Sequence, residues 1–161
     1  MRVVSDTSPI CYLLLIGHVE ILPRLFGQIA VPQMVRQELA HPGAASEVRG
    51  WIARPPGWLV VHDVPVEPAP DLARLHQGER EAILLASRLS ADLLLLDDRR
   101  ARQAASGRRI GVTGLLGILD LAAKADLLAL PEAVESLRRT SFRVEPRLLK
   151  GLLERSLHEE A

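Results

Sequence analysis

The sequence predicts an α/β fold in which a parallel sheet carries helices on both faces. Short apolar segments alternate along the chain with longer segments of helical periodicity, which is the pattern of strands joined by helical crossovers. The tetra-leucine run at 93–96 is wholly apolar, as expected for a strand that is buried on both sides of a parallel sheet. Apolar residues form 48% of the 161 residues but aromatic residues only 3%, so the core must consist mainly of Leu, Val, Ile and Ala.

The first half of the chain divides into strands and helices at clear boundary signals. Residues 2–5 are expected to form a strand that ends at Asp6. Ser8 and Pro9 then suit the cap and the first position of a helix that runs to about Gly17. The elements expected next are a helix at 19–26, a strand at 28–31, a helix that starts at Pro32, a helix at 44–53 and a strand at 58–61.

The second half begins with an extended connection at 63–71, which contains three prolines. Apolar residues at helical spacing then predict a helix at 78–89. The elements expected after it are a strand at 93–96, an Arg-rich helix that reaches 106–107, a strand at 109–112, a helix at 115–125, and helices at 131–140 and 146–158. The length and the absence of repeats favour one domain over residues 1–161.

Composition excludes several classes of protein. Twenty basic and twenty acidic residues leave no net charge, so nucleic-acid binding would need a local basic patch instead of a basic coat. The only cysteine, Cys11, rules out an intrachain disulfide, and no Cys/His set has the spacing of a zinc site. No signal peptide and no apolar run of membrane-spanning length is present. We therefore expect a cytoplasmic protein without a membrane partner.

Acidic residues follow two of the predicted strands directly. Asp6 follows the first strand, and Asp97 and Asp98 follow the tetra-leucine strand. Ligands of open parallel α/β folds bind beyond the carboxyl ends of the strands, so these acids are expected at a binding site. Clustered carboxylates repel one another unless a cation lies between them, and Mg²⁺ and Mn²⁺ prefer oxygen ligands.

Three further acids lie on predicted helices, and each acid also has a purely structural interpretation. Glu38 lies on the helix after the second strand, and Glu79 and Glu81 lie at the start of the helix at 78–89. Glu38 suits a solvated helix face, and the two later glutamates suit a helix N-terminus. Asp6 and Asp98 are both placed to cap a following helix. Their joint occurrence is more specific than any one of them.

Five segments together resemble the PIN-domain family of VapC-like toxin ribonucleases. They are VVSDTSP at 3–9, VPQMVRQEL at 31–39, GEREAI at 78–83, LLDDRRAR at 95–102 and IGVTGLLGIL at 110–119. The chain is most similar to the DUF3368 branch of predicted PIN-domain nucleic-acid-binding proteins. The resemblance covers residues 2–130, whereas the C-terminal helices in 131–161 fit it loosely.

The resemblance implies a three-layer α/β/α, Rossmann-like fold with an acidic Mg²⁺ or Mn²⁺ site. It further implies cleavage of single-stranded RNA that leaves a 5′-phosphate and a 3′-hydroxyl. The family's four acidic positions, catalytic and metal-binding, correspond here to Asp6, Glu38, Glu81 and Asp98, and Glu81 stands where many relatives have aspartate. Beside them, Thr7 and Ser8 match hydroxyl or amide positions, and Glu79 and Asp97 are accessory candidates.

Partners are also implied. Arg99, Arg100 and Arg102 are expected to contact RNA phosphates, although a solvated helix face is an alternative. Many PIN-domain relatives act as the toxin of a toxin–antitoxin pair, so a cognate antitoxin protein is expected. The apolar run at 10–16 and the apolar residues of 19–26 predict an exposed surface that forms a homodimer.

Two other functions remain as alternatives. A receiver-like regulatory domain would need its acidic pair after the first strand, whereas Asp97 and Asp98 come late in the chain. It would also need a late lysine outside a helix, whereas Lys124 lies within a predicted one. A non-catalytic PIN-like module that binds nucleic acid or protein is the second alternative, because the presence of acids does not establish their geometry.

Overall fold

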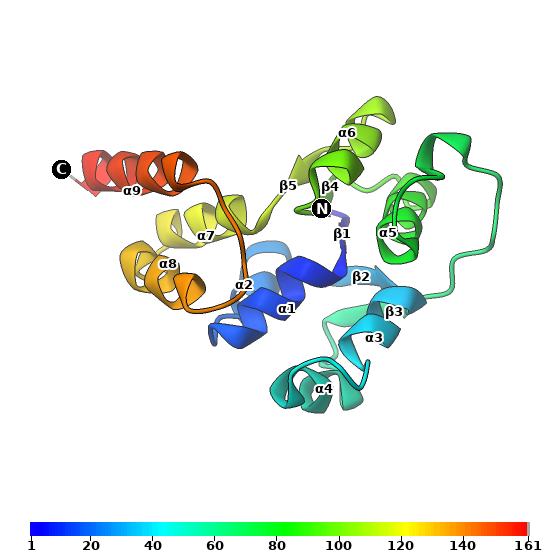
Figure 1. Cartoon of the computed structure of the whole chain (residues 1–161), viewed down its shortest axis with the longest axis horizontal. Coiled ribbons are helices and arrows are strands. Elements are labelled where there is room, and N and C mark those ends of the chain that lie inside the picture. The colour runs from blue at the N-terminus through cyan, green and yellow to red at the C-terminus, as the bar shows by residue number, and fades with distance from the viewer. Residues whose placement is uncertain (161) are drawn as a thin grey trace.

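Five parallel strands form one sheet in the order β3-β2-β1-β4-β5 (Figure 1). The structure is a computed structural model that describes residues 1–160. The strands are β1 (Val3–Ser5), β2 (Ile29–Pro32), β3 (Leu59–His62), β4 (Leu93–Leu95) and β5 (Val112–Thr113). The predicted parallel α/β fold is confirmed.

Helices connect all five strands, and three more elements follow the last strand (Figure 1). The helices are α1 (Thr7–Leu15), α2 (Ile21–Phe26), α3 (Gln33–Leu39), α4 (Ser46–Ala53), the 3₁₀ turn η1 (Pro70–Leu72), α5 (Gln77–Arg88), α6 (Arg99–Gly107), α7 (Leu115–Lys124), α8 (Leu130–Arg138) and α9 (Pro146–Glu160). Figure 1 shows α7, α8 and α9 grouped at the end of the molecule opposite to α5.

Helix α1 begins earlier than its sequence signals predict. The expected cap was Ser8, but the helix starts at Thr7 and Asp6 occupies the N-cap position in an extended conformation. Pro9 is therefore the third helical residue, and it is tolerated because the first turn of a helix has no backbone partners for its N–H groups. The Asp6 side chain makes no capping hydrogen bond, so its carboxylate is available for another role.

Strand β5 begins three residues later than expected. The chain turns sharply after α6, where Arg109 has a φ of 60°, a left-handed conformation that a strand does not contain. The backbone N–H of Ile110 still donates a 3.0 Å hydrogen bond to the carbonyl of Ala105 at the end of α6. Only Val112 and Thr113 pair with β4, opposite Leu94 and Leu95.

Alternate strand residues face two separate cores, one on each side of the sheet. Val3 and Leu95 pack on one side with α1–α4 and the C-terminal helices. Val4 and Leu94 pack on the other side with α5, α6 and η1. Because successive strand residues point to opposite faces, a sheet covered on both sides requires the continuous apolar strands that the sequence contains.

The topology predicts where a ligand would bind. The chain adds β2 and β3 on one side of β1 and then crosses to add β4 and β5 on the other side. Ser5 and Leu95 pair in register at the carboxyl ends of β1 and β4. A reversal of strand order opens a crevice beyond the carboxyl ends of the two central strands, so the residues that follow Ser5 and Leu95 border this crevice.

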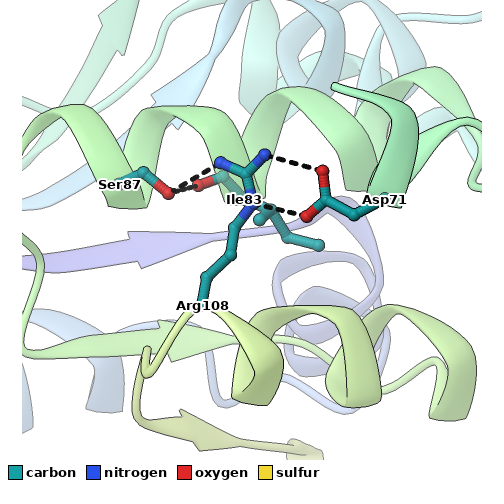
Figure 2. A network of polar contacts seen from close by, with 4 residues as sticks. All are labelled: Asp71, Ile83, Ser87 and Arg108. Carbon is teal, nitrogen blue, oxygen red and sulfur yellow. Dashed lines mark hydrogen bonds and ion pairs between the residues drawn. The ribbon is translucent and has the colours of Figure 1, made fainter. Parts of the chain in front are cut away.

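A polar network holds the connection between β3 and α5 against the rest of the molecule (Figure 2). The Arg108 guanidinium donates to both carboxylate oxygens of Asp71, at 2.8 and 3.0 Å, and to the Ser87 hydroxyl at 3.3 Å. That hydroxyl in turn donates to the carbonyl of Ile83 at 3.0 Å. The network therefore fastens η1 to both α5 and the end of α6.

We expect Asp71→Asn to lower the melting temperature slightly at pH 7, because a two-point ion pair is lost at a largely solvated site. The Arg108 guanidinium lowers the pKa of Asp71. The pair therefore stabilises the fold above the unfolded-state pKa, and this contribution is lost as the pH falls through the lower folded-state pKa. Thermal unfolding of Asp71→Asn and wild type should differ at pH 7 and converge in acid. Glu135→Gln, which removes an exposed pair at 4.0 Å, is the control. Equal melting temperatures for Asp71→Asn and wild type at pH 7 would show that the Asp71–Arg108 pair does not stabilise the fold.

Candidate active site

Asp6 follows β1 directly at the carboxyl edge of the sheet, beside the end of β4. Its backbone N–H donates to the carbonyl of Leu95 at 2.9 Å, which continues the pairing of the two strands by one residue. Its side chain is only 6% exposed. A buried carboxylate without a cationic partner is costly unless its charge is neutralised by protonation or by a bound cation.

The pKa of Asp6 is raised from 3.8 to about 7. Burial is the main cause, and the negative charges of Glu38, Glu79 and Asp97 raise this pKa further, while a hydrogen bond from the Thr7 backbone lowers it. Carboxylates from four separate segments therefore act on one another at the carboxyl edge of the sheet. Such mutual repulsion of acids in a crevice is typical of a catalytic or cation-binding site.

Asp97 follows β4 and is held in place from two sides. Its Oδ1 accepts a 2.8 Å hydrogen bond from the backbone N–H of Leu115, the first residue of α7, and its Oδ2 accepts one from the Ser8 hydroxyl at 3.5 Å. Burial raises the pKa of Asp97, whereas the Leu115 bond, the Arg102 charge and the Ser8 bond lower it. Its carboxylate is thus fixed beside the crevice by α1 and α7.

Glu38 reaches the site from the last turn of α3. The Thr7 hydroxyl donates a hydrogen bond to Glu38 Oε2. The carboxylate also lies against Gly78 at the start of α5, where an added Cβ would be 2.9 Å from both Glu38 Cδ and Oε2. Glycine at this position therefore leaves the space that the Glu38 carboxylate occupies.

We expect Gly78→Ala to reduce the RNA cleavage that the family resemblance implies, without destabilising the fold. The new methyl group would displace the flexible end of Glu38 and disturb its bond to Thr7, while alanine favours a helix over glycine by roughly 1 kcal/mol. Cleavage rates and thermal unfolding of the purified variant test both parts. Gly151→Ala, in α9 where a Cβ meets nothing within 4 Å, is the matched control. Full activity in Gly78→Ala would show that the position of Glu38 is unimportant.

Glu79 joins this cluster from α5, and Asp98 acts on Glu79 from the start of α6. Glu79 Oε2 accepts a 3.2 Å bond from the His76 backbone in the capping box of α5. Burial and the charges of Asp98 and Glu38 raise the pKa of Glu79, although the His76 bond and charge oppose them. Asp98 is exposed and caps α6, because its Oδ1 accepts a 2.9 Å bond from the Ala101 backbone.

Glu81 is the sequence-predicted acid with the fewest contacts. It is half-buried and lies three residues after Gly78, hence on the same face of α5 as the glycine that contacts Glu38. Among residues 1–158, no hydrogen bond or ion pair of its side chain is found. The mutual charge effects instead join Asp6, Glu38, Glu79 and Asp97, with Asp98 acting on Glu79.

The three arginines of α6 point to different places. Arg102 and Arg99 line a pocket together with Asp97, and a Cβ at position 114 would be 2.7 Å from both Arg102 Nη1 and Asp97 Oδ1. Arg100 instead lines a pocket with Asp71 on the side of η1. Arg99 and Arg102 are therefore placed beside the acids, whereas Arg100 is not.

The donor set has the chemistry that a hard divalent cation requires. The charged groups that could bind a cation are all carboxylates, and hydroxyls of Thr7 and Ser8 hold two of them. Within the described part of the chain, no group of three or more His, Cys, Asp or Glu side chains is arranged so that it could hold a metal ion. Mg²⁺ does not need one, because it is usually held by one or two carboxylates and keeps several of its waters. The residues therefore fit a hydrated cation.

Comparison with known proteins identifies one family. The model of the DUF3368 family, described as a PIN domain, matches residues 2–158, a range that includes α8 and most of α9. No curated protein and no solved structure shows a significant match to the chain. In the part of the chain that the structure describes, no helix has the length and apolar character to cross a membrane.

Proposed function

This chain belongs to the PIN-domain family, and on that premise we propose that it is a Mg²⁺- or Mn²⁺-dependent endoribonuclease that cleaves single-stranded RNA. PIN domains are generally nucleases and typically use divalent metals. The observation that supports the proposal most strongly is the burial of Asp6 among the charges of Glu38, Glu79 and Asp97. A cation in the crevice would neutralise these charges.

The proposed roles follow from the position of each side chain. Asp6, Glu38 and Asp97 would hold the cation, directly or through its waters. The remaining acids, Glu79, Glu81 and Asp98, would add negative charge around it. When bound, a divalent cation polarises a phosphate oxygen and makes an attacking water more acidic. Thr7 and Ser8 orient Glu38 and Asp97 by hydrogen bonds, and such supporting contacts are commonly worth 10- to 100-fold in affinity or activity. Arg102 is placed to contact the phosphate next to Asp97.

The direct test is cleavage of a mixed single-stranded RNA pool in Mn²⁺ or Mg²⁺, with EDTA in a parallel reaction. The proposal predicts fragments with 5′-phosphate and 3′-hydroxyl ends in metal, and intact RNA in EDTA. Fragments that form equally in EDTA, or that carry 2′,3′-cyclic phosphates, would contradict it. Asp6→Asn protein purified in the same way controls for contaminating ribonucleases.

A non-catalytic PIN-like binding module is the second candidate. It is favoured by the finding that, among the described side chains, no three acids are arranged as a group that could hold a metal ion. Asp97 and Glu38 are also engaged by Leu115 and Thr7. This candidate predicts that the protein binds RNA but leaves it intact at every metal concentration. The cleavage experiment therefore separates the two functions.

The finer proposal is that this ribonuclease is a cytoplasmic toxin with an antitoxin protein. The motive is the acidic cluster, because an Arg- or Lys-bearing segment of a partner could pair with the half-buried Glu38 and the exposed Asp98 and block RNA. Expression in a host without the partner should slow growth, whereas expression of Asp6→Asn should not. Equal growth with soluble wild-type and variant protein would exclude the toxin role and leave the nuclease assignment open.

The homodimer also stays a proposal. The apolar residues of α1 and α2 on which it was based are buried or half-buried against the core, so they leave less exposed surface than expected. Among the described residues, the exposed large apolar side chains are Met1, Val66, Leu121, Leu148 and Leu157. Light scattering at high micromolar concentration would show a dimer if the proposal holds and a monomer if it fails.

A further inference from the structure

A pocket of about 940 Å³ opens directly beside Asp97, between α6, the start of α7 and the C-terminal segment at 142–155. We propose that this pocket, named here the arginine groove, binds the backbone of single-stranded RNA next to the cleavage site. Its wall on the C-terminal side carries Arg143 and Arg155, which the sequence motifs do not mark. The proposal rests on the proposed ribonuclease function and assigns the path of its substrate.

Positive charge faces the groove from both walls. Arg99 and Arg102 come from α6, and Arg143 and Arg155 come from the segment before α9 and from α9 itself. Among the described residues, the guanidinium groups of Arg99, Arg143 and Arg155 have no hydrogen-bond or ion-pair partner. Two further acids besides Asp97 line the groove, namely Asp120 and Glu145. The Asp120 carboxylate already pairs with Lys124 at 3.0 Å. Unpaired guanidinium groups on two facing walls suit a chain of phosphates.

The groove leads into the acidic cluster at Gly114. A Cβ added at this residue would be 2.7 Å from both Arg102 Nη1 and Asp97 Oδ1, so both charged groups lie over the glycine backbone. Gly114 is buried and precedes α7, whose first N–H binds Asp97. A phosphate held by Arg102 would therefore be the neighbour of the phosphate at the proposed cation site.

The groove also has an apolar part, which favours a single strand over a duplex. Leu116, Val144 and Leu148 line it, and Leu148 is 59% exposed although it is a large apolar side chain. Unpaired bases can stack or pack on apolar side chains, whereas the bases of a duplex are covered by their own pairing. Arginines with adjacent apolar residues are thus the combination that a single strand requires.

The C-terminal wall is fixed to α1, the helix that directly follows Asp6. Tyr12 of α1 shares a 2.9 Å hydrogen bond with the Ser141 hydroxyl. Its ring also packs edge-on against Phe142, with centroids 5.0 Å apart. These contacts hold the segment that carries Arg143 in a defined place relative to the acids. The groove is therefore built into the fold around the proposed active site.

The test compares Arg143→Ala/Arg155→Ala with Arg139→Ala/Arg147→Ala, which removes two exposed arginines that do not line the groove. Binding of a fluorescent 12-nucleotide RNA is measured in EDTA by anisotropy over a range of salt. We expect the groove variant to bind at least about tenfold more weakly and the slope of log affinity against log salt to fall by about 1.4, since each lost single-strand phosphate contact contributes about 0.7. The control variant should bind within twofold of wild type.

The outcomes distinguish failure of the groove from failure of the proposed ribonuclease. Equal binding by both double variants would overturn the groove, even if metal-dependent cleavage is observed. Weaker binding by the groove variant, with RNA that stays intact in metal, would support the groove and refute the ribonuclease. If the protein bound an RNA duplex as tightly as the single strand, the assignment to single-stranded RNA would be overturned. The same holds if a polyglutamate peptide bound as tightly and its binding weakened equally in Arg143→Ala/Arg155→Ala. Circular dichroism melting of each variant verifies that the fold is intact.

Discussion

Asp6→Asn is expected to reduce metal-dependent RNA cleavage by at least about 100-fold, because loss of mere supporting partners of a metal site already costs 10- to 100-fold. Asp6 is the most deeply buried acid of the cluster, and the charges of three other acids raise its pKa. Asparagine keeps the shape of the side chain but cannot supply a full negative charge to a cation. Initial rates on a labelled single-stranded RNA at saturating Mn²⁺ measure the effect.

Asp63→Asn is the matched control for this experiment. Asp63 is exposed and precedes the long connection to α5, outside the acidic cluster. Asp63→Asn makes the same chemical change outside the cluster, so its rate of RNA cleavage should stay within twofold of wild type. If Asp6→Asn retained half of the wild-type rate or more, the acidic cluster would not be the active site.

The metal-free protein is expected to lose stability as the pH rises from 4 to 8, by up to about 4 kcal/mol from Asp6 alone. The pKa of Asp6 is about 7 in the folded protein against 3.8 for the ordinary group. The folded state therefore binds more protons than the unfolded state in this window. The resulting contribution to the free energy of unfolding is complete below the unfolded-state pKa. It is lost as the pH rises through about 7. The raised pKa values of Glu79 and Asp97 act in the same direction.

Urea unfolding in EDTA at pH 4.5, 6 and 8 tests this expectation. Wild type should become less stable over the series, and Asp6→Asn should change much less, so that the variant is the more stable protein at pH 8. Mn²⁺ at pH 8 should restore much of the loss in wild type, because a cation that binds only the folded state stabilises it. Stability that rises with pH over this range would contradict the account of a repulsive acidic cluster.

Asp6 and the Asp97–Asp98 pair could be located from the sequence because strand ends are readable. A parallel sheet places all its carboxyl ends at one edge, and the two acidic points follow strands that turn out to be neighbours in register. The sequence could not decide which member of the pair caps α6 and which contacts α1 and α7. That depends on the start of α6: Asp98 caps it, which leaves Asp97 to contact Leu115 and Ser8.

Contacts between helices were harder to predict. Glu79 has a local explanation in the capping box of α5, which gives no indication that the charges of Glu38 and Asp98 also act on it. Gly78 carried no signal of its own, since a helical glycine shows its purpose only once the Glu38 carboxylate is seen against it. Arg143 and Arg155 are distant in sequence from every acidic motif. Only the packing of α9 near α7, with the Tyr12 contacts, brings them beside Asp97.

Calorimetric titration of Mn²⁺ into the metal-free protein at pH 6.5, in two buffers of different ionisation enthalpy, tests the central claim most directly. Near this pH a large part of the Asp6 population is protonated, since its pKa is about 7, and a cation must displace that proton to bind. We predict saturable binding by wild type with release of a substantial fraction of a proton, and neither signal from Asp6→Asn. The absence of saturable binding by wild type, or the same binding and proton release by Asp6→Asn, would contradict the claim that this acidic cluster holds a divalent cation.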